Sequence, residues 1–168
     1  PEDSQDALNF VLEQAGVEAQ TSIAIQTQLN GTQLSVQTKI ISENGLPSSY
    51  KQVVYLFQDG LIFPQVNYYV NTEGSPWYGL GNPIPDFVHN EVWETSLTNI
   101  FGDPIASTAA FEEYTVSYAP VNLSSYGHTT TPNTFNPERF GVIVMLVDET
   151  NSAVNAQYVK AGQSVNFQ

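Results

Sequence analysis

The sequence predicts a mainly β protein, an antiparallel β-sandwich of immunoglobulin-like or jelly-roll type, and three observations support this prediction. Apolar and polar residues alternate through 19–40, which is typical of strands with one buried and one solvent-facing side. Apolar runs at 53–57, 61–63 and 139–147 have the length of buried strands, and the last is expected to be central. Turn sequences separate these segments at short, regular intervals, as in two-layer antiparallel folds.

Two tight turns are predicted to form hairpins. Asn30-Gly31 divides the alternating segment 19–40, and Asn-Gly between two such runs is a strong hairpin signal. Asp59-Gly60 divides the second pair of apolar runs, and a two-residue turn of type I′ would place both residues at positive φ. Because the apolar residues of this second pair are consecutive, we expect it near the centre of a sheet and covered on both faces.

The C-terminal part adds further strands. Alternation at 111–118 predicts one strand, and the segment 154–159 is expected to return after the central strand. The segment 164–167 is expected to add an edge strand.

Helices are expected at two places. For 1–16, helical spacing of apolar residues follows a capping residue, Asp3 or Ser4, and Gly16 suits the position after the helix end. Because an isolated helix of this length is marginal, we expect it to pack as a lid on the sheet or to end an upstream domain, leaving 17–168 as the β-domain. The spacing of apolar residues also predicts a short internal helix, whose residues are Asn90 to Asn99.

Composition and charge argue against several classes of function. The formal net charge is −13, and the only Lys and Arg residues are Lys39, Lys51, Arg139 and Lys160. Binding of nucleic acid or anionic lipid needs clustered cations, so neither is an expected partner. The absence of Cys excludes disulfides and thiolate catalysis. No segment is long and apolar enough to span a membrane as a helix, and because the chain begins at Pro1, we expect any targeting segment to lie upstream.

Three segments carry a resemblance to a known family: VVYLFQDGLIFPQ, VHNEVWETSLTNIFGDPI and RFGVIVMLVDETNSAVNAQYV. They are similar to the C-terminal region of the Omp-twenty-eight-related outer-membrane lipoproteins, over residues 17–159. The positions that match are Leu56, Asp59, Gly60, Gln65, His89, Asn90, Leu97, Phe101, Gly102, Val144, Val147 and Asp148.

The resemblance implies a cell-envelope protein of Gram-negative bacteria, at the outer-membrane surface or in the periplasm. It also implies an upstream lipid anchor and no assigned reaction. The upstream portion of the family looks thioredoxin-like and often carries a CxxC pair, but this chain has no Cys and therefore inherits no redox role. Glu94 stands where members often have Arg, which argues against an anion-binding role at that position.

Residues for catalysis or metal binding are sparse. His89 lies near Asp86, Glu91 and Glu94 in the sequence, but a zinc or iron site normally brings more ligands together. We therefore expect His89 to hydrogen-bond the preceding loop or to cap the helix that begins near Asn90. No Gly-x-Ser-x-Gly elbow is present, and we predict no enzyme activity, no cofactor and no metal.

The irregular region 67–90 is the best candidate for function, because a loop this long is either functional or ordered by packing. Tyr68, Tyr69, Trp77 and Tyr78 offer flat ring faces for a glycan, a peptide or a host-surface ligand. The alternative is that these rings hold the loop against the body.

The resulting prediction is a non-catalytic surface module for adhesion or ligand binding. A carbohydrate-binding or carbohydrate-processing accessory domain is the alternative, and a hydrolase of unrecognised type is a weaker third hypothesis.

Overall fold

The computed structural model describes residues 19–126 and 133–168, which form eleven β-strands and two short 3-10 helices. The strands are β1 (Thr21–Asn30), β2 (Gln33–Ser42), β3 (Lys51–Gln58), β4 (Leu61–Gln65), β5 (Ile84–His89), β6 (Val92–Ser96), β7 (Asp103–Pro104), β8 (Tyr114–Asn122), β9 (Phe140–Val147), β10 (Ala153–Lys160) and β11 (Ser164–Val165). The 3-10 helices are η1 (Leu123–Ser125) and η2 (Pro137–Arg139). The helix predicted for 1–16 lies outside the described residues.

One sheet has four antiparallel strands in the order β11-β1-β2-β8. The predicted first hairpin is confirmed as β1 and β2, but its ends are Asn30 and Gln33, so the two-residue loop is Gly31-Thr32 rather than Asn30-Gly31. Gly31 has a φ of 60°, as the first position of a type II′ turn requires. The predicted edge strand near the C-terminus is also confirmed, because β11 pairs with β1.

The second sheet has five strands in the order β10-β9-β3-β6, with β7 also paired to β3. The predicted central strand is confirmed as β9, which lies between β10 and β3. The predicted position of 53–57 near the centre of a sheet is confirmed as well, because β3 has β9 on one side and β6 on the other.

The predicted second hairpin is wrong. β4 does not pair with β3 but with β5, in a separate two-stranded sheet. Both edges of β3 are occupied by other strands, so the chain cannot fold back on itself at Asp59-Gly60. Gly60 has the expected positive φ of 70°, but it serves at a junction between two sheets rather than in a tight turn.

The predicted internal helix at 90–99 is also wrong, because Val92–Ser96 forms β6. The apolar spacing fits a helix, but the segment contains β-branched residues and pairs with the edge of β3. This non-local pairing outweighs the local periodicity. The strand predicted at 111–118 begins later and runs further, as β8; Pro120 is tolerated because β8 lies at a sheet edge.

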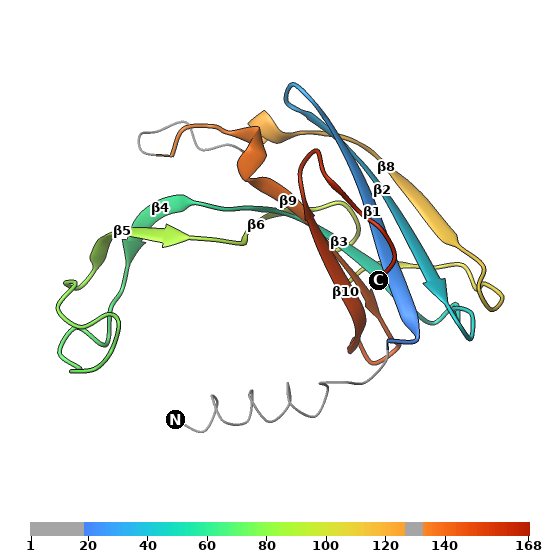
Figure 1. Ribbon diagram of the computed structural model, residues 1–168, viewed down its shortest axis with the longest axis horizontal. Helices are drawn as coiled ribbons and strands as arrows, with labels where there is room; N and C mark the ends of the chain where they lie inside the picture. The colour runs from blue at the N-terminus through green and yellow to red at the C-terminus, as the bar shows by residue number, and fades with distance from the viewer. Residues whose placement is uncertain (1–18, 127–132) are drawn as a thin grey trace.

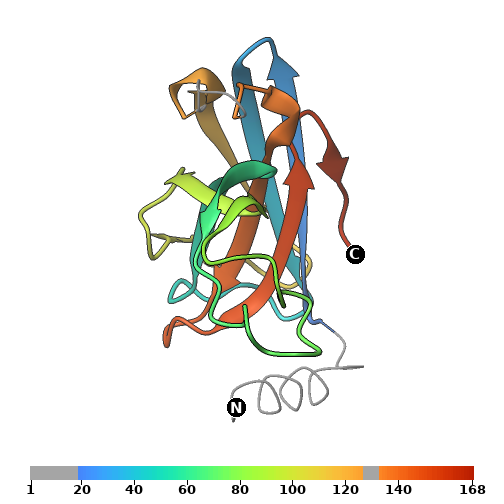
Figure 2. The ribbon, with the colours of Figure 1, turned by 90° about the vertical axis from the view of Figure 1, so that its left-hand side faces the viewer.

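The two large sheets face each other across one apolar core (Figure 1 and Figure 2). Its largest contributions come from β1, β2, β3 and β9, through Ile23, Ile25, Leu34, Val36, Ile40, Val54, Leu56, Phe140, Val142, Val144 and Leu146. Each strand contributes alternate residues, so one face of each sheet is buried here. The mainly β, antiparallel class is therefore confirmed, whereas the immunoglobulin-like or jelly-roll type stays a prediction.

One polar link crosses this core. The Gln52 Nε2 of β3 donates to the Thr38 Oγ1 of β2 over 2.6 Å, and the two residues are 2% and 0% exposed. Beside them, burial raises the pKa of Tyr118 to about 12, although its hydrogen bond with Thr38 acts in the opposite direction. The paired groups keep the polar atoms of two opposing strands satisfied inside the core.

Replacing Leu146 with Ala is expected to destabilise the protein by about 2–5 kcal/mol, because a fully buried side chain is removed and a cavity remains. The matched control is Met145→Ala, one residue earlier on the opposite face of β9, where the side chain is only partly buried. Urea denaturation of both variants measures the difference. Equal losses of stability would contradict the placement of β9 between the core and an outer face.

Candidate functional site

A two-stranded arm, residues 61–89, carries the aromatic loop. It consists of β4, β5 and the connection 66–83, with Leu61 opposite His89 at its base. Figures 1 and 2 show the arm leaving the body at the ends of β3 and β6. It extends on the side of the five-stranded sheet that faces away from the four-stranded sheet.

The arm meets the body at a polar joint of four residues, Asp59 and Gly60 on one chain segment and Asn90 and Glu91 on the other. The Glu91 N–H donates to Asp59 Oδ1 over 2.5 Å, and the Gly60 N–H donates to Asn90 Oδ1 over 3.0 Å. Glu91 has a φ of 54°, so both segments bend through left-handed conformations here. The side chains therefore supply hydrogen bonds where one strand ladder ends and the next begins.

Cations of the body also hold the joint. The Asp59 N–H donates to the Arg139 carbonyl over 2.9 Å, and Arg139 Nη1 donates to the Gly60 carbonyl over 3.1 Å. The Lys160 ammonium forms an ion pair with the Asp59 carboxylate. Burial lowers the pKa of Lys160. Two of the four Lys and Arg residues of the chain thus bind this one joint.

Asn133 fastens the first strand of the arm. Its Oδ1 accepts from the Ile62 N–H over 2.7 Å, and its Nδ2 donates to the Ile62 carbonyl over 2.8 Å. Asn133 is only 3% exposed. One amide thus satisfies both backbone groups of Ile62, as a neighbouring strand would, and protects this edge of β4.

The tip of the arm is organised by Asn67, which is 3% exposed. Its Nδ2 donates to the carbonyls of Trp77 and Gly81 over 2.8 and 2.9 Å. Its Oδ1 accepts from the Tyr69 N–H, and its own N–H donates to Asn82 Oδ1, both over 3.0 Å. A buried side-chain amide with three hydrogen bonds, together with the backbone N–H of the same residue, therefore fixes the shape of the loop.

The four predicted site residues lie at this tip and are exposed. The exposed fractions are 86% for Tyr68, 56% for Tyr69, 39% for Trp77 and 50% for Tyr78. Tyr68, Tyr69 and Trp77 line one cleft of about 280 Å³, whereas Tyr78 lies outside its lining. Phe87 also lines this cleft, and the centroid of its ring lies 5.4 Å from that of Trp77.

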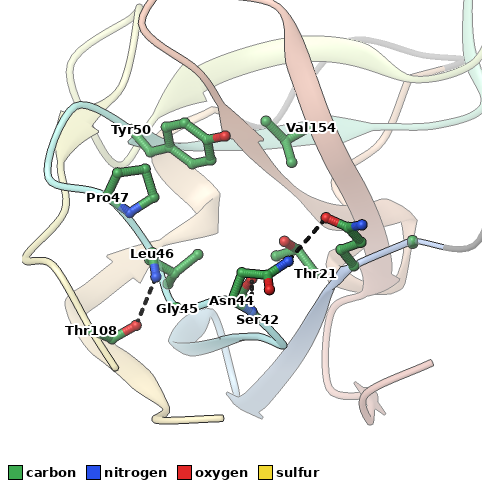
Figure 3. A pocket seen from close by; sticks show the side chains of 11 residues that line it. Thr21, Ser42, Asn44, Gly45, Leu46, Pro47, Tyr50, Thr108 and Val154 are labelled. Atoms are coloured by element: carbon green, nitrogen blue, oxygen red, sulfur yellow. Dashed lines mark hydrogen bonds between the residues drawn. The ribbon is translucent and has the colours of Figure 1, made fainter. Parts of the chain in front are cut away.

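A second cavity, of about 660 Å³, lies at one end of the two facing sheets (Figure 3). Thr21, Ser42, Asn44, Tyr50 and Val154 line it together with the loop around Gly45. Figure 3 shows the Tyr50 ring on one side of this space and the Asn44 amide on the other. Its lining residues are uncharged, so it offers hydroxyl and amide groups beside apolar surface.

A family model described as outer membrane protein Omp28 matches residues 3–165. The chain belongs to this family. Membership confirms the predicted location in the cell envelope, at the outer membrane. A comparison with curated proteins gives no match. In the described ranges 19–126 and 133–168, no helix has the length and apolar character needed to cross a membrane.

The structure gives a physical reason for part of the Omp28 resemblance. Asp59, Gly60, His89 and Asn90 come from two separate matching segments and lie together at the base of the arm. His89 is expected from the sequence either to hydrogen-bond the preceding loop or to cap a helix that begins near Asn90. The helix-cap alternative is wrong, because Val92–Ser96 is strand β6. His89 instead hydrogen-bonds the Phe63 carbonyl of β4 through Nε2, over 3.3 Å.

The sequence predicts the aromatic rings of the tip but not the residues that position them. Asn133 acts on Ile62, which is distant in the sequence, so no local pattern reveals its role. Asn67 makes one local bond, to the Tyr69 N–H, but its bonds to Trp77 and Gly81 depend on the path of the whole loop. The approach of Phe87 to Trp77 depends on the pairing of β4 with β5, which was not predicted. Among the described residues, no group of three or more His, Asp or Glu side chains could hold a metal ion.

Asn67→Ala is expected to loosen the tip while leaving the core intact, because it removes three side-chain hydrogen bonds from the loop. Hydrogen exchange of 66–83 should accelerate by about tenfold or more, since each lost bond contributes roughly 1 kcal/mol. Asn71→Ala, an exposed position in the same loop, is the control and should exchange like the parent protein. Unchanged exchange in Asn67→Ala would show that the rings, not this amide, hold the loop.

Proposed function

We propose that this Omp28-family chain is a non-catalytic cell-envelope module that binds a protein or peptide ligand through the tip of the arm. The observation that carries the proposal is the exposure of Tyr68, Tyr69, Trp77 and Tyr78 on an element held away from the core. Adhesion is one form that such binding takes. The same proposal includes attachment of the module to the envelope of a Gram-negative bacterium through an upstream lipid anchor.

The way the tip is ordered supports ligand contact. If the rings served to hold the loop, they would be buried against the body, but Tyr68 is 86% exposed. The Asn67 amide and backbone hydrogen bonds such as Gly79 N–H to the Val70 carbonyl, over 3.0 Å, already shape the loop. Rigid, exposed aromatic rings bind ligands with little loss of conformational entropy.

The chemistry of the tip cleft favours an apolar or aromatic group of the ligand. The lining is mostly ring and aliphatic surface, from Tyr68, Tyr69, Trp77, Ile84 and Phe87, with a single additional amide from Gln65 beside Asn67. Exposed apolar surface of this kind marks interaction sites in soluble domains. Because the net charge is −13, a neutral or cationic ligand is favoured over an anionic one.

Carbohydrate binding is the second candidate. The specific observation in its favour is that the rings of Tyr68, Tyr69 and Trp77 border one cleft with the polar side chain of Gln65. Sugars present apolar faces to such rings and hydroxyls to such amides. A carbohydrate-binding accessory domain would use the same residues.

A mixed array of immobilised peptides and glycans tests the proposal. We expect reproducible binding to peptide features, weakened by about tenfold or more in Trp77→Ala and in Tyr68→Ala, because a buried aromatic contact at an interface commonly contributes more than 1 kcal/mol. The control is Phe111→Ala, which removes another ring, 68% exposed, outside the arm. It should bind like the parent protein.

Binding to glycans alone, lost in Trp77→Ala, would replace the leading proposal with the carbohydrate one. Binding that is insensitive to both tip variants would contradict a role for the arm in either candidate function.

A further inference from the structure

The outer faces of the two large sheets differ in chemistry. Outward-facing positions of the four-stranded sheet are mainly Gln and Ser, as in a shallow depression lined by Gln26, Gln28, Ser35 and Gln37. The outer face of the five-stranded sheet carries large exposed apolar residues, namely Trp93, Ile100 and Tyr158 at 54%, 53% and 59% exposure. An exposed apolar face on only one of two sheets points to an interaction surface.

This face contains a cleft of about 300 Å³, which we call the sheet cleft. Its lining residues are Tyr55, Phe57, Glu91, Trp93, Ile100 and Ile143. Three are aromatic, two are aliphatic, and Glu91 is the only one with a charge. The sheet cleft is separate from the tip cleft, with which it shares no lining residue.

The register of the sheet explains how the rings of the sheet cleft are placed. Trp93, Phe57, Gly141 and Lys160 are cross-strand neighbours in one row over β6, β3, β9 and β10. A Cβ atom at Gly141 would lie 2.3 Å from Phe57 Cζ, so the absence of a side chain there lets the Phe57 ring cross the row. The Lys160 Nζ lies 5.1 Å from the centroid of this ring, so the row already holds one cation against an aromatic face.

The charges beside the sheet cleft do not balance. Lys160 is paired with Asp59, so this lysine does not neutralise the carboxylate of Glu91. In the described part of the chain, this carboxylate has no ion pair or hydrogen bond. The position of Glu91 is nevertheless fixed, since its N–H donates to Asp59 Oδ1 and its φ is 54°. The local excess is one negative charge beside three aromatic rings.

We propose that the sheet cleft binds an arginine side chain of a basic partner polypeptide. A guanidinium group is planar and weakly hydrated, so it stacks on an indole ring while its N–H groups reach a carboxylate. Trp93 supplies the exposed ring and Glu91 supplies the carboxylate. The net charge of −13 attracts such a partner from a distance. This inference does not depend on ligand binding at the arm tip.

Nuclear magnetic resonance tests the proposal directly, because the chain has only two Trp residues and therefore two indole N–H signals. Titration with Nα-acetyl-arginine amide should shift the Trp93 signal, and Nα-acetyl-citrulline amide, which has nearly the same shape without the charge, should not. The Trp77 signal at the arm tip is the internal reference, because no carboxylate of the described residues lines the tip cleft and any response there should therefore be the same for the arginine and citrulline probes. Glu91→Gln should weaken the arginine response by about tenfold, because a charge-assisted contact is lost.

Glu91→Gln keeps the size of the side chain and the backbone N–H, so the amide spectrum reports whether its fold is retained. Equal responses to arginine and citrulline probes, or no response of Trp93 to arginine, would overturn the proposal. So would a response that survives Glu91→Gln with the fold intact. A Trp93 shift that follows protein concentration without any probe would assign this face to a second copy of the chain instead.

Discussion

The polar joint at Asp59-Gly60 and Asn90-Glu91 is the constraint on which the arrangement of the arm depends. β3 and β6 belong to the core sheet, whereas the segments that continue from them, β4 and β5, leave it. Both segments must bend at the same level and keep their backbone groups satisfied. The reciprocal bonds from Glu91 N–H to Asp59 and from Gly60 N–H to Asn90 meet this requirement.

The body and the arm are stabilised by different kinds of interaction. The body buries two sheet faces in one core, whereas an isolated two-stranded ribbon is only marginally stable in water. The arm therefore relies on contacts at its base, from Arg139 to Gly60 and from Asn133 to Ile62. These contacts hold the exposed rings of the tip in a defined place, which any ligand-binding role requires.

Strands whose side chains follow a regular pattern can be predicted from the sequence alone, as the alternation in 19–40 and the apolar run of β9 show. The sequence does not reveal which strands pair with one another when their apolar residues are consecutive. Asp59-Gly60 looks like a hairpin turn, and 90–99 has helical spacing, yet the pairing of β3 with β6 and β9 overrides both signals. The tip rings were predictable from composition. The sheet cleft was not, since Trp93 of β6 meets Tyr55 and Phe57 of β3 only through cross-strand pairing.

Residual dipolar couplings of backbone N–H groups test most directly whether the joint fixes the arm on the body. If it does, couplings from β4 and β5 and couplings from β1, β2 and β9 will fit one alignment tensor. Reduced couplings in the arm, or a separate tensor for 61–89, would show that the arm moves independently. That result would contradict a preformed position for the aromatic tip.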